Sequence, residues 1–113
     1  MRSLALCSLL LVACGTDDPR APTVEVISTE ILAPACGAPQ CHSTSTLQSG
    51  YAFDTLAASK VALKSLQNGT GHNKRSLLEE LTTRRMPPDV PLDDADLTLI
   101  ETWIALPASQ QGL

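Results

Sequence analysis

The sequence predicts a small all-α domain built from three to four short helices. Three observations predict it. Apolar residues recur at helical spacing in several stretches. Capping residues and Gly or Pro mark the ends of those stretches. No pair of alternating apolar stretches with a tight turn between them indicates a β-hairpin. A chain of 113 residues has room for one such domain.

The first 13 residues predict a secretory signal that takes no part in the fold. Arg2 precedes an apolar run from Leu4 to Ala13, which is too short to span a bilayer. The run ends in Leu11-Val12-Ala13-Cys14, which resembles the lipobox of bacterial lipoproteins. The resemblance implies that Cys14 is lipidated and anchors the chain in the bacterial cell envelope, on the periplasmic side or the outer surface. An ordinary signal with an unmodified cysteine is the alternative.

Residues 14–22 are expected to be the lipidated N-terminus and a flexible tether, because they are polar and contain proline. The folded domain then covers residues 23–113. Loss of the signal removes only Arg2, which leaves 7 basic and 12 acidic residues and a net charge of −5. An acidic surface argues against binding to nucleic acid.

The first predicted helix covers Val24 to Ala33, with Val24, Ile27 and Ile31 on one face. Its β-branched residues would also suit a short strand. Pro34 is expected to stop or kink this helix just before Cys36.

The second predicted helix runs from Phe53 to Gln67. Asn68-Gly69 is expected to end it, with glycine in a left-handed turn. Its apolar residues are Leu56, Val61, Leu63 and Leu66.

A shorter helix is predicted from Ser76 to Thr83, opened by a capping box between Ser76 and Glu79. The last helix has Asp93 as its N-cap and Asp96 at its third position. Leu92 and Leu97 are placed to form a hydrophobic staple, and Pro107 stops the helix. The predicted buried stripe is Leu97, Ile100, Trp103 and Ile104.

The predicted core is thin. Its aromatic residues are Tyr51, Phe53 and Trp103 alone, and the rest is Ala, Leu, Ile and Val from short helices. A flat apolar cofactor would supply the apolar volume that this core lacks.

The chemistry is expected at Cys36, Cys41 and His42. Two cysteines with a histidine directly after the second are the attachment signature of c-type haem. The two thiols add to vinyl groups on one edge of the porphyrin, and the adjacent imidazole reaches the iron. Here four residues separate the cysteines, where two are usual, and Gly37 and Pro39 make the extra residues easy to loop out. A structural disulfide and a metal or redox dithiol site are the alternatives. Zinc is disfavoured because no second Cys/His pair completes four ligands.

Residues from Ile27 to Ala105 resemble the small cytochrome c domains of exported bacterial proteins. The resemblance implies one covalent haem c inside a helical bundle, with Met86 as the second axial ligand. It also implies that the last helix packs across the first. The matching landmarks are Ile31-Leu32, Cys41-His42, Ser76-Leu77-Leu78, Arg85-Met86-Pro87-Pro88, Leu92, Leu97, Ile100 and Trp103-Ile104.

Met86 lies in a proline-stiffened loop, which suits the presentation of a thioether to iron. Its alternative role is that of a flexible core filler. His72 is the rival sixth ligand, and an open sixth site is the third possibility. Arg84 and Arg85 are candidates to pair with haem propionates or to be simply solvated.

The predicted function is that of a membrane-tethered one-electron carrier. Its partners are other redox proteins, basic ones by preference, because the carrier is acidic. The alternative is a haem-free lipoprotein in which a Cys36–Cys41 disulfide staples a binding or envelope module. No constellation of catalytic acid, base or nucleophile is visible, so no enzymatic activity is expected.

Overall fold

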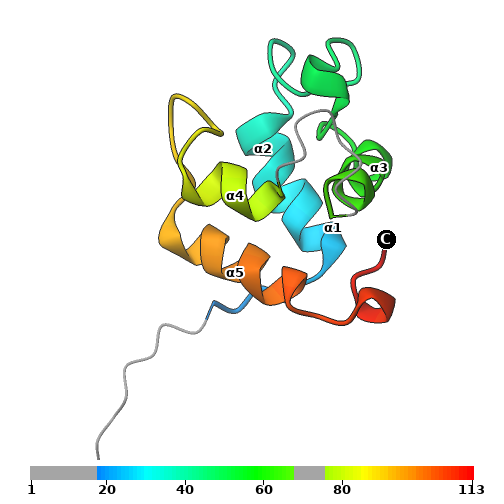
Figure 1. The fold of residues 1–113 in the computed structure, drawn as a ribbon, viewed down its shortest axis with the longest axis vertical. Helices are drawn as coiled ribbons and strands as arrows, with labels where there is room; N and C mark the ends of the chain where they lie inside the picture. The colour runs from blue at the N-terminus through cyan, green and yellow to red at the C-terminus, as the bar shows by residue number, and fades with distance from the viewer. Residues whose placement is uncertain (1–17, 68–75) are drawn as a thin grey trace, which may run out of the picture.

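The computed structural model describes residues 18–67 and 76–113, and within these ranges the fold is all-α, as predicted, with no strand (Figure 1). Four helical segments make up the described part of the fold. These are the N-terminal helix (Val24–Cys36), α3 (Leu56–Gln67), α4 (Leu77–Thr82) and α5 (Asp94–Ile104), with single 3₁₀ turns at η2 (Gln48–Gly50) and η3 (Ala108–Gln110).

The N-terminal helix is continuous but changes its winding twice. It begins as α1 (Val24–Val26), widens into the π-helical segment η1 (Ile27–Leu32) and ends as α2 (Ala33–Cys36). Of the two outcomes predicted for Pro34, the stop was therefore wrong, while a change from π to α winding does occur beside it. Pro34 lies in the first turn of α2, directly after the wider π-helical segment, which accommodates a residue without an N–H. The π-helical bond from Ala33 N–H to the Ser28 carbonyl lies directly before it.

Helix α3 begins three residues later than predicted. Thr55 caps it, because the Thr55 hydroxyl accepts a hydrogen bond from the Ala58 N–H at 3.2 Å. Phe53 therefore lies before the helix and is buried. Val61 points to solvent with 73% of its surface exposed, because its position on the helix does not lie on the face that packs on the core. That inward face consists of Ser59, Ala62, Leu63 and Leu66.

The predicted caps of α4 and α5 are confirmed. The Ser76 hydroxyl accepts from the Glu79 N–H at 3.1 Å, and the Asp93 carboxylate accepts from the Asp96 N–H at 2.8 Å. The buried stripe of α5 agrees with the prediction at Ile100 and Trp103 and differs at its edges. Its buried residues are Leu99, Ile100 and Trp103, while Leu97 and Ile104 are only partly buried against the core.

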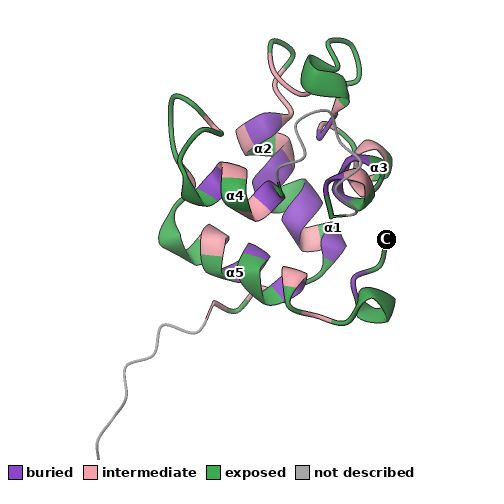
Figure 2. Ribbon diagram, viewed as in Figure 1, coloured by how far each residue is buried: buried purple, intermediate pink, exposed green. Residues whose placement is uncertain are grey.

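The N-terminal helix lies at the centre of the bundle. Its η1 segment contacts both α3 and α5, and α4 contacts α3 and α5 in turn (Figure 1). The last helix thus packs on the first, as the cytochrome resemblance implies. Buried residues occur along this helix and on α3, α4 and α5 around it (Figure 2). Ile27, Leu32, Leu63, Ile100 and Trp103 have no exposed surface.

The C-terminal residues close one end of the core. The Trp103 indole N–H donates to the Gln111 carbonyl at 3.1 Å. The Gln111 side-chain amide donates to the carbonyls of Ile104 and Leu106, at 3.0 and 2.9 Å. Carbonyls left free at the end of α5 are thereby satisfied.

Residues 18–22, the described part of the predicted tether, contact the bundle. The Arg20 guanidinium bonds to the carboxylates of Asp18 and Asp96, each at 2.7 Å. The hydrogen bond from Arg20 holds the pKa of Asp18 below its ordinary value. The predicted signal and Cys14 lie outside the described residues. Among the helices that are described, none has the length and apolar character needed to cross a membrane.

Candidate functional site

Residues Cys36 to His42 fold into a closed turn, which the four-residue spacing between the cysteines makes possible. Cys36 is the last residue of α2, and the His42 N–H donates to the Cys36 carbonyl at 2.9 Å. Inside the turn, the Cys41 N–H donates to the Ala38 carbonyl at 2.9 Å. The extra residues therefore loop outward, and His42 is returned to the side of Cys36.

The His42 imidazole is oriented by a backbone carbonyl. Its Nδ1 lies 2.8 Å from the carbonyl oxygen of Gln48. A carbonyl only accepts hydrogen bonds, so Nδ1 carries the proton of the neutral ring and Nε2 keeps its lone pair. This is the arrangement in which a histidine serves as a metal ligand through Nε2.

Two aromatic rings support the imidazole from the sides. The Phe53 ring meets it edge-on, with centroids 5.6 Å apart at 78°, and the Tyr51 ring lies at 6.3 Å and 51°. Leu47 and Ser49, on either side of Gln48, adopt left-handed backbone conformations with φ of 50° and 56°. Such conformations are rare outside glycine and turn the chain sharply around the Gln48 carbonyl.

Two hollows meet at three of the predicted site residues. Cys36, His42 and Met86 line both a small cavity of about 70 Å³ and an open groove of about 870 Å³. Cys41 lines the groove. The small cavity is otherwise mostly apolar, and its remaining lining residues are Ser49, Tyr51, Phe53, Leu66, Leu77, Glu80 and Leu81.

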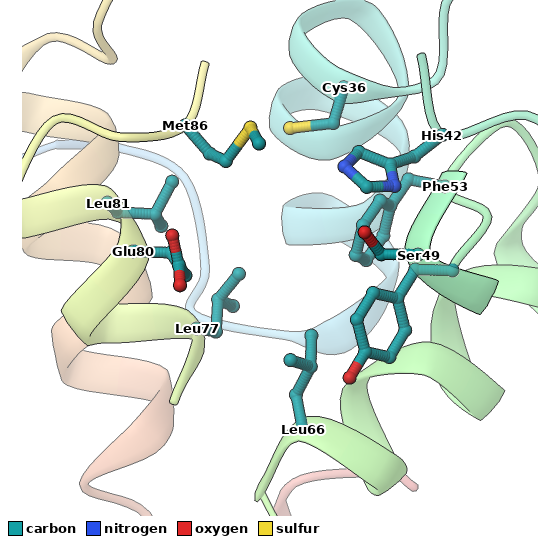
Figure 3. A pocket seen from close by; sticks show the side chains of 10 residues that line it. Cys36, His42, Ser49, Phe53, Leu66, Leu77, Glu80, Leu81 and Met86 are labelled. Atoms are coloured by element: carbon teal, nitrogen blue, oxygen red, sulfur yellow. The ribbon is translucent and has the colours of Figure 1, made fainter. Parts of the chain in front are cut away.

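Met86 and His42 stand on opposite walls of the cavity (Figure 3). In this view the Met86 thioether extends inward from the chain after α4. The imidazole extends from the opposite side, and the Cys36 thiol lies above the space between them. Met86 is 38% exposed, so it is not a core filler. The fold thus brings together residues that lie 44 positions apart in the chain.

Both cysteines of the motif have free thiols. Cys36 is buried at the end of α2, and Cys41 is half-buried. Burial, with a smaller contribution from the neighbouring Cys41, raises the pKa of the Cys36 thiol to about 11. Cys36 is therefore a protonated thiol at neutral pH.

Other predicted residues are placed differently. Arg84 and Arg85 are exposed, and neither lines the cavity or the groove. His72 lies outside the described residues. Tyr51 and Phe53 line the cavity beside His42.

Sequence reasoning missed the Gln48 carbonyl and the cavity wall formed by Leu66, Leu77 and Leu81. A backbone carbonyl leaves no mark in the sequence. The three leucines are recognisable only as apolar helical positions.

The side chains at this site are ones that a haem could use. In the described ranges no three His, Cys, Asp or Glu side chains come together to hold a metal. Haem needs no such cluster, because the porphyrin supplies four ligands and the protein supplies one or two axial ones. The imidazole of His42, the thioether of Met86, the thiols of Cys36 and Cys41 and the apolar lining are groups that could hold a c-type haem.

Comparisons of the chain with models of known protein families, with curated proteins and with solved structures found no match.

Proposed function

We propose that the protein is a membrane-tethered one-electron carrier with a single covalent c-type haem. The haem would be attached at Cys36 and Cys41 and ligated by His42 and Met86. The observation that carries this proposal is the orientation of His42. Its Nδ1 is committed to the Gln48 carbonyl, which leaves Nε2 free beside a cavity that Met86 faces from the other wall.

Bound haem supplies reversible one-electron chemistry at its iron. The chain contributes the rest. The leucines and aromatic rings of the cavity exclude water, and the hydrogen bond to Gln48 keeps the imidazole in one tautomer and orientation. Ligation by Met86 and His42 would give the haem a higher reduction potential than ligation by two histidines.

The groove beside the cysteines suits a basic redox partner. Glu30, Asp89 and Asp93 contribute carboxylates to its lining, as does Asp96, which is paired with Arg20. Among the described residues no Lys or Arg lines it. Opposite charges on a partner would speed encounter without making the complex long-lived. Lipidation of Cys14 would hold the carrier in the cell envelope, where such partners meet it.

The decisive experiment expresses the full chain in a bacterial host with a c-type haem maturation system. We expect a coloured protein with a Soret band and a mass increased by one haem. The matched control replaces Cys36 and Cys41 by Ser, and it should lose the covalent increment. A colourless wild-type protein, two hydrogens lighter than its reduced form, would refute the proposal and support the disulfide-stapled alternative.

A further inference from the structure

The closed turn from Cys36 to His42 is stabilised by hydrogen bonds from residues that follow His42. The Pro39 carbonyl, at the tip of the turn, accepts hydrogen bonds from the hydroxyls of Ser43, at 3.3 Å, and Thr46. Ser43 is buried, with 4% of its surface exposed. The four residues between the cysteines are therefore part of a built structure rather than a free loop.

Asp54 ties this structure to the rest of the fold. One oxygen of its carboxylate, Oδ2, accepts from the Thr44 N–H at 2.9 Å and from the Thr44 hydroxyl at 2.8 Å. The preceding residue, Phe53, donates its N–H to the His42 carbonyl at 2.7 Å. Residues 42–44 are thus hydrogen-bonded to residues 53–54, and these bonds close the base of the loop between them.

The backbone of Asp54 also packs on the cysteine side of the motif. A Cβ atom added at Gly37 would lie 2.9 Å from the Asp54 Cα and 3.0 Å from its nitrogen. Gly37 directly follows Cys36, and Thr44 lies two residues after His42. Asp54 therefore lies against residues next to both ends of the motif, Gly37 after Cys36 and Thr44 after His42.

We infer that Asp54 is a positioning residue for cofactor attachment, which holds Cys41 and His42 in register with Cys36. This inference rests on the proposed function. In each attachment a cysteine S–H adds across a vinyl C=C bond. An S–C bond and a C–H bond form, the S–H bond and the π bond break, and no oxidant or reductant is consumed. Both additions require the two sulfurs to reach one edge of the same flat molecule. A four-residue spacing meets this requirement only if the turn is held closed.

The test expresses the full chain with Asp54→Ala, Asp54→Asn or Thr44→Val in the same haem maturation system. Peptide mass spectrometry then counts thioether bonds at Cys36 and at Cys41. Asp54→Ala should raise the fraction of protein attached through Cys36 alone by about fivefold, the factor that the loss of an ordinary hydrogen bond represents. Thr44→Val, which keeps the backbone donor, should give a smaller increase. Asp54→Asn keeps an acceptor oxygen and should restore attachment at both cysteines.

Ser76→Ala is the matched control, since it removes the cap of α4 and leaves residues 36–54 untouched. It should lower the melting temperature of the haem-free protein without changing the thioether count. If Asp54→Ala lowers the melting temperature in the same way and keeps both thioethers, Asp54 is merely structural and the inference fails alone. If Asp54→Ala does not fold, an unchanged count in Thr44→Val overturns it. A wild-type protein without haem overturns the proposed function together with the inference.

Discussion

His42 is held on three sides by neighbours close to it in sequence. Gln48 fixes one ring nitrogen, while Phe53 and Tyr51 limit the tilt of the ring. The hydrogen bond partner is a backbone carbonyl, so side-chain substitutions at position 48 leave it in place. An imidazole held in this way would change its orientation little on binding a metal or when the charge of that metal changed.

Met86→Ala tests the second axial ligand. In the haem-loaded protein we expect changed spectra of the oxidised state and a lower reduction potential, because the thioether that favours the reduced iron is lost. Visible spectroscopy and a redox titration measure both. Val90→Ala in the same loop is the control, since Val90 is 73% exposed and lies outside the small cavity. Oxidised-state spectra unchanged by Met86→Ala would rule Met86 out as a ligand.

Gly37→Ala tests the close approach beneath the motif. The added methyl group would lie 2.7 Å from the Ala33 carbonyl oxygen and 2.9 Å from the Asp54 Cα, and neither backbone atom moves freely. We expect the free energy of unfolding to fall by about 1–3 kcal/mol, as in other overpacked sites.

Urea denaturation of the haem-free protein measures the effect of Gly37→Ala. Gln40→Ala, at an exposed position of the same turn, should change stability by less than about 0.5 kcal/mol. Equal stability of Gly37→Ala and wild type would mean that the turn and Asp54 are not in contact.

Among individual residues, side chains with distinctive chemistry were predictable. Cys36, His42 and Met86 were named from spacing and resemblance, and the fold gathers them at one cavity. The role of Asp54 was not predicted, because its hydrogen bonds to Thr44 join residues ten positions apart and follow no sequence pattern. The Gln48 carbonyl was not predicted either, since every residue has such a group.

Helix α4 ends in a left-handed residue that is not glycine. Arg84 has a φ of 57°, and its N–H donates to the Leu81 carbonyl at 3.2 Å. The next residue, Arg85, donates to the Glu80 carbonyl at 3.1 Å. This pair of bonds is the Schellman ending, and it turns the chain from α4 toward Met86.

Arg84→Gly should therefore stabilise the haem-free protein. A left-handed conformation costs a non-glycine residue about 1–2 kcal/mol. The greater freedom of glycine in the unfolded chain offsets about 0.5–1 kcal/mol of that gain. The net expectation is an increase of about 0.5–1 kcal/mol in the free energy of unfolding.

Thermal or urea denaturation checks this expectation against Arg85→Gly, a neighbour without a left-handed backbone. Arg85→Gly should give no stabilisation. A loss of stability in Arg84→Gly would show that the Arg84 side chain makes a contact that outweighs its backbone cost.

Helix ends were more predictable than helix faces. Ser76 and Asp93 cap α4 and α5 as predicted, because a cap depends on residues three positions apart. Pro34 and Val61 were misjudged for reasons outside their own segments. The π-helical winding of η1 accommodates the proline, and the packing of α3 on η1 decides which apolar residues face inward.

At the scale of the whole molecule, two carboxylates tie separate parts of the chain together. Asp54 holds the motif loop through Thr44, and Asp96 of α5 bonds to Arg20, whose other partner is the nearby Asp18. Hydrogen bonds from Thr44 lower the pKa of Asp54, and hydrogen bonds from Arg20 lower that of Asp18, both from an ordinary value of 3.8.

These pKa shifts predict acid sensitivity. Both groups bind protons more tightly in the unfolded chain, so their contribution to stability is present above pH 3.8. It is lost as the pH falls through the lower folded-state values. Melting temperatures of the haem-free protein should fall as the pH drops below about 4.

Asp54→Asn combined with Asp18→Asn should flatten that drop, whereas Glu101→Gln, an exposed carboxylate on α5, serves as the control. An acid transition as steep in the double variant as in wild type would assign the sensitivity to other groups.

The sequence by itself determined the helical class, the helix caps and the identity of the reactive side chains, because these depend on neighbours a few positions apart. The tertiary structure alone decided that Met86 faces His42 and that Asp54 braces the four-residue turn. It also decided that a backbone carbonyl orients the imidazole. Met86 reaches His42 because α4 packs on α3 and α5, which both contact the central helix. The contacts of Gln48 and Asp54 depend on how residues 42–54 fold into one loop, which no short sequence pattern specifies.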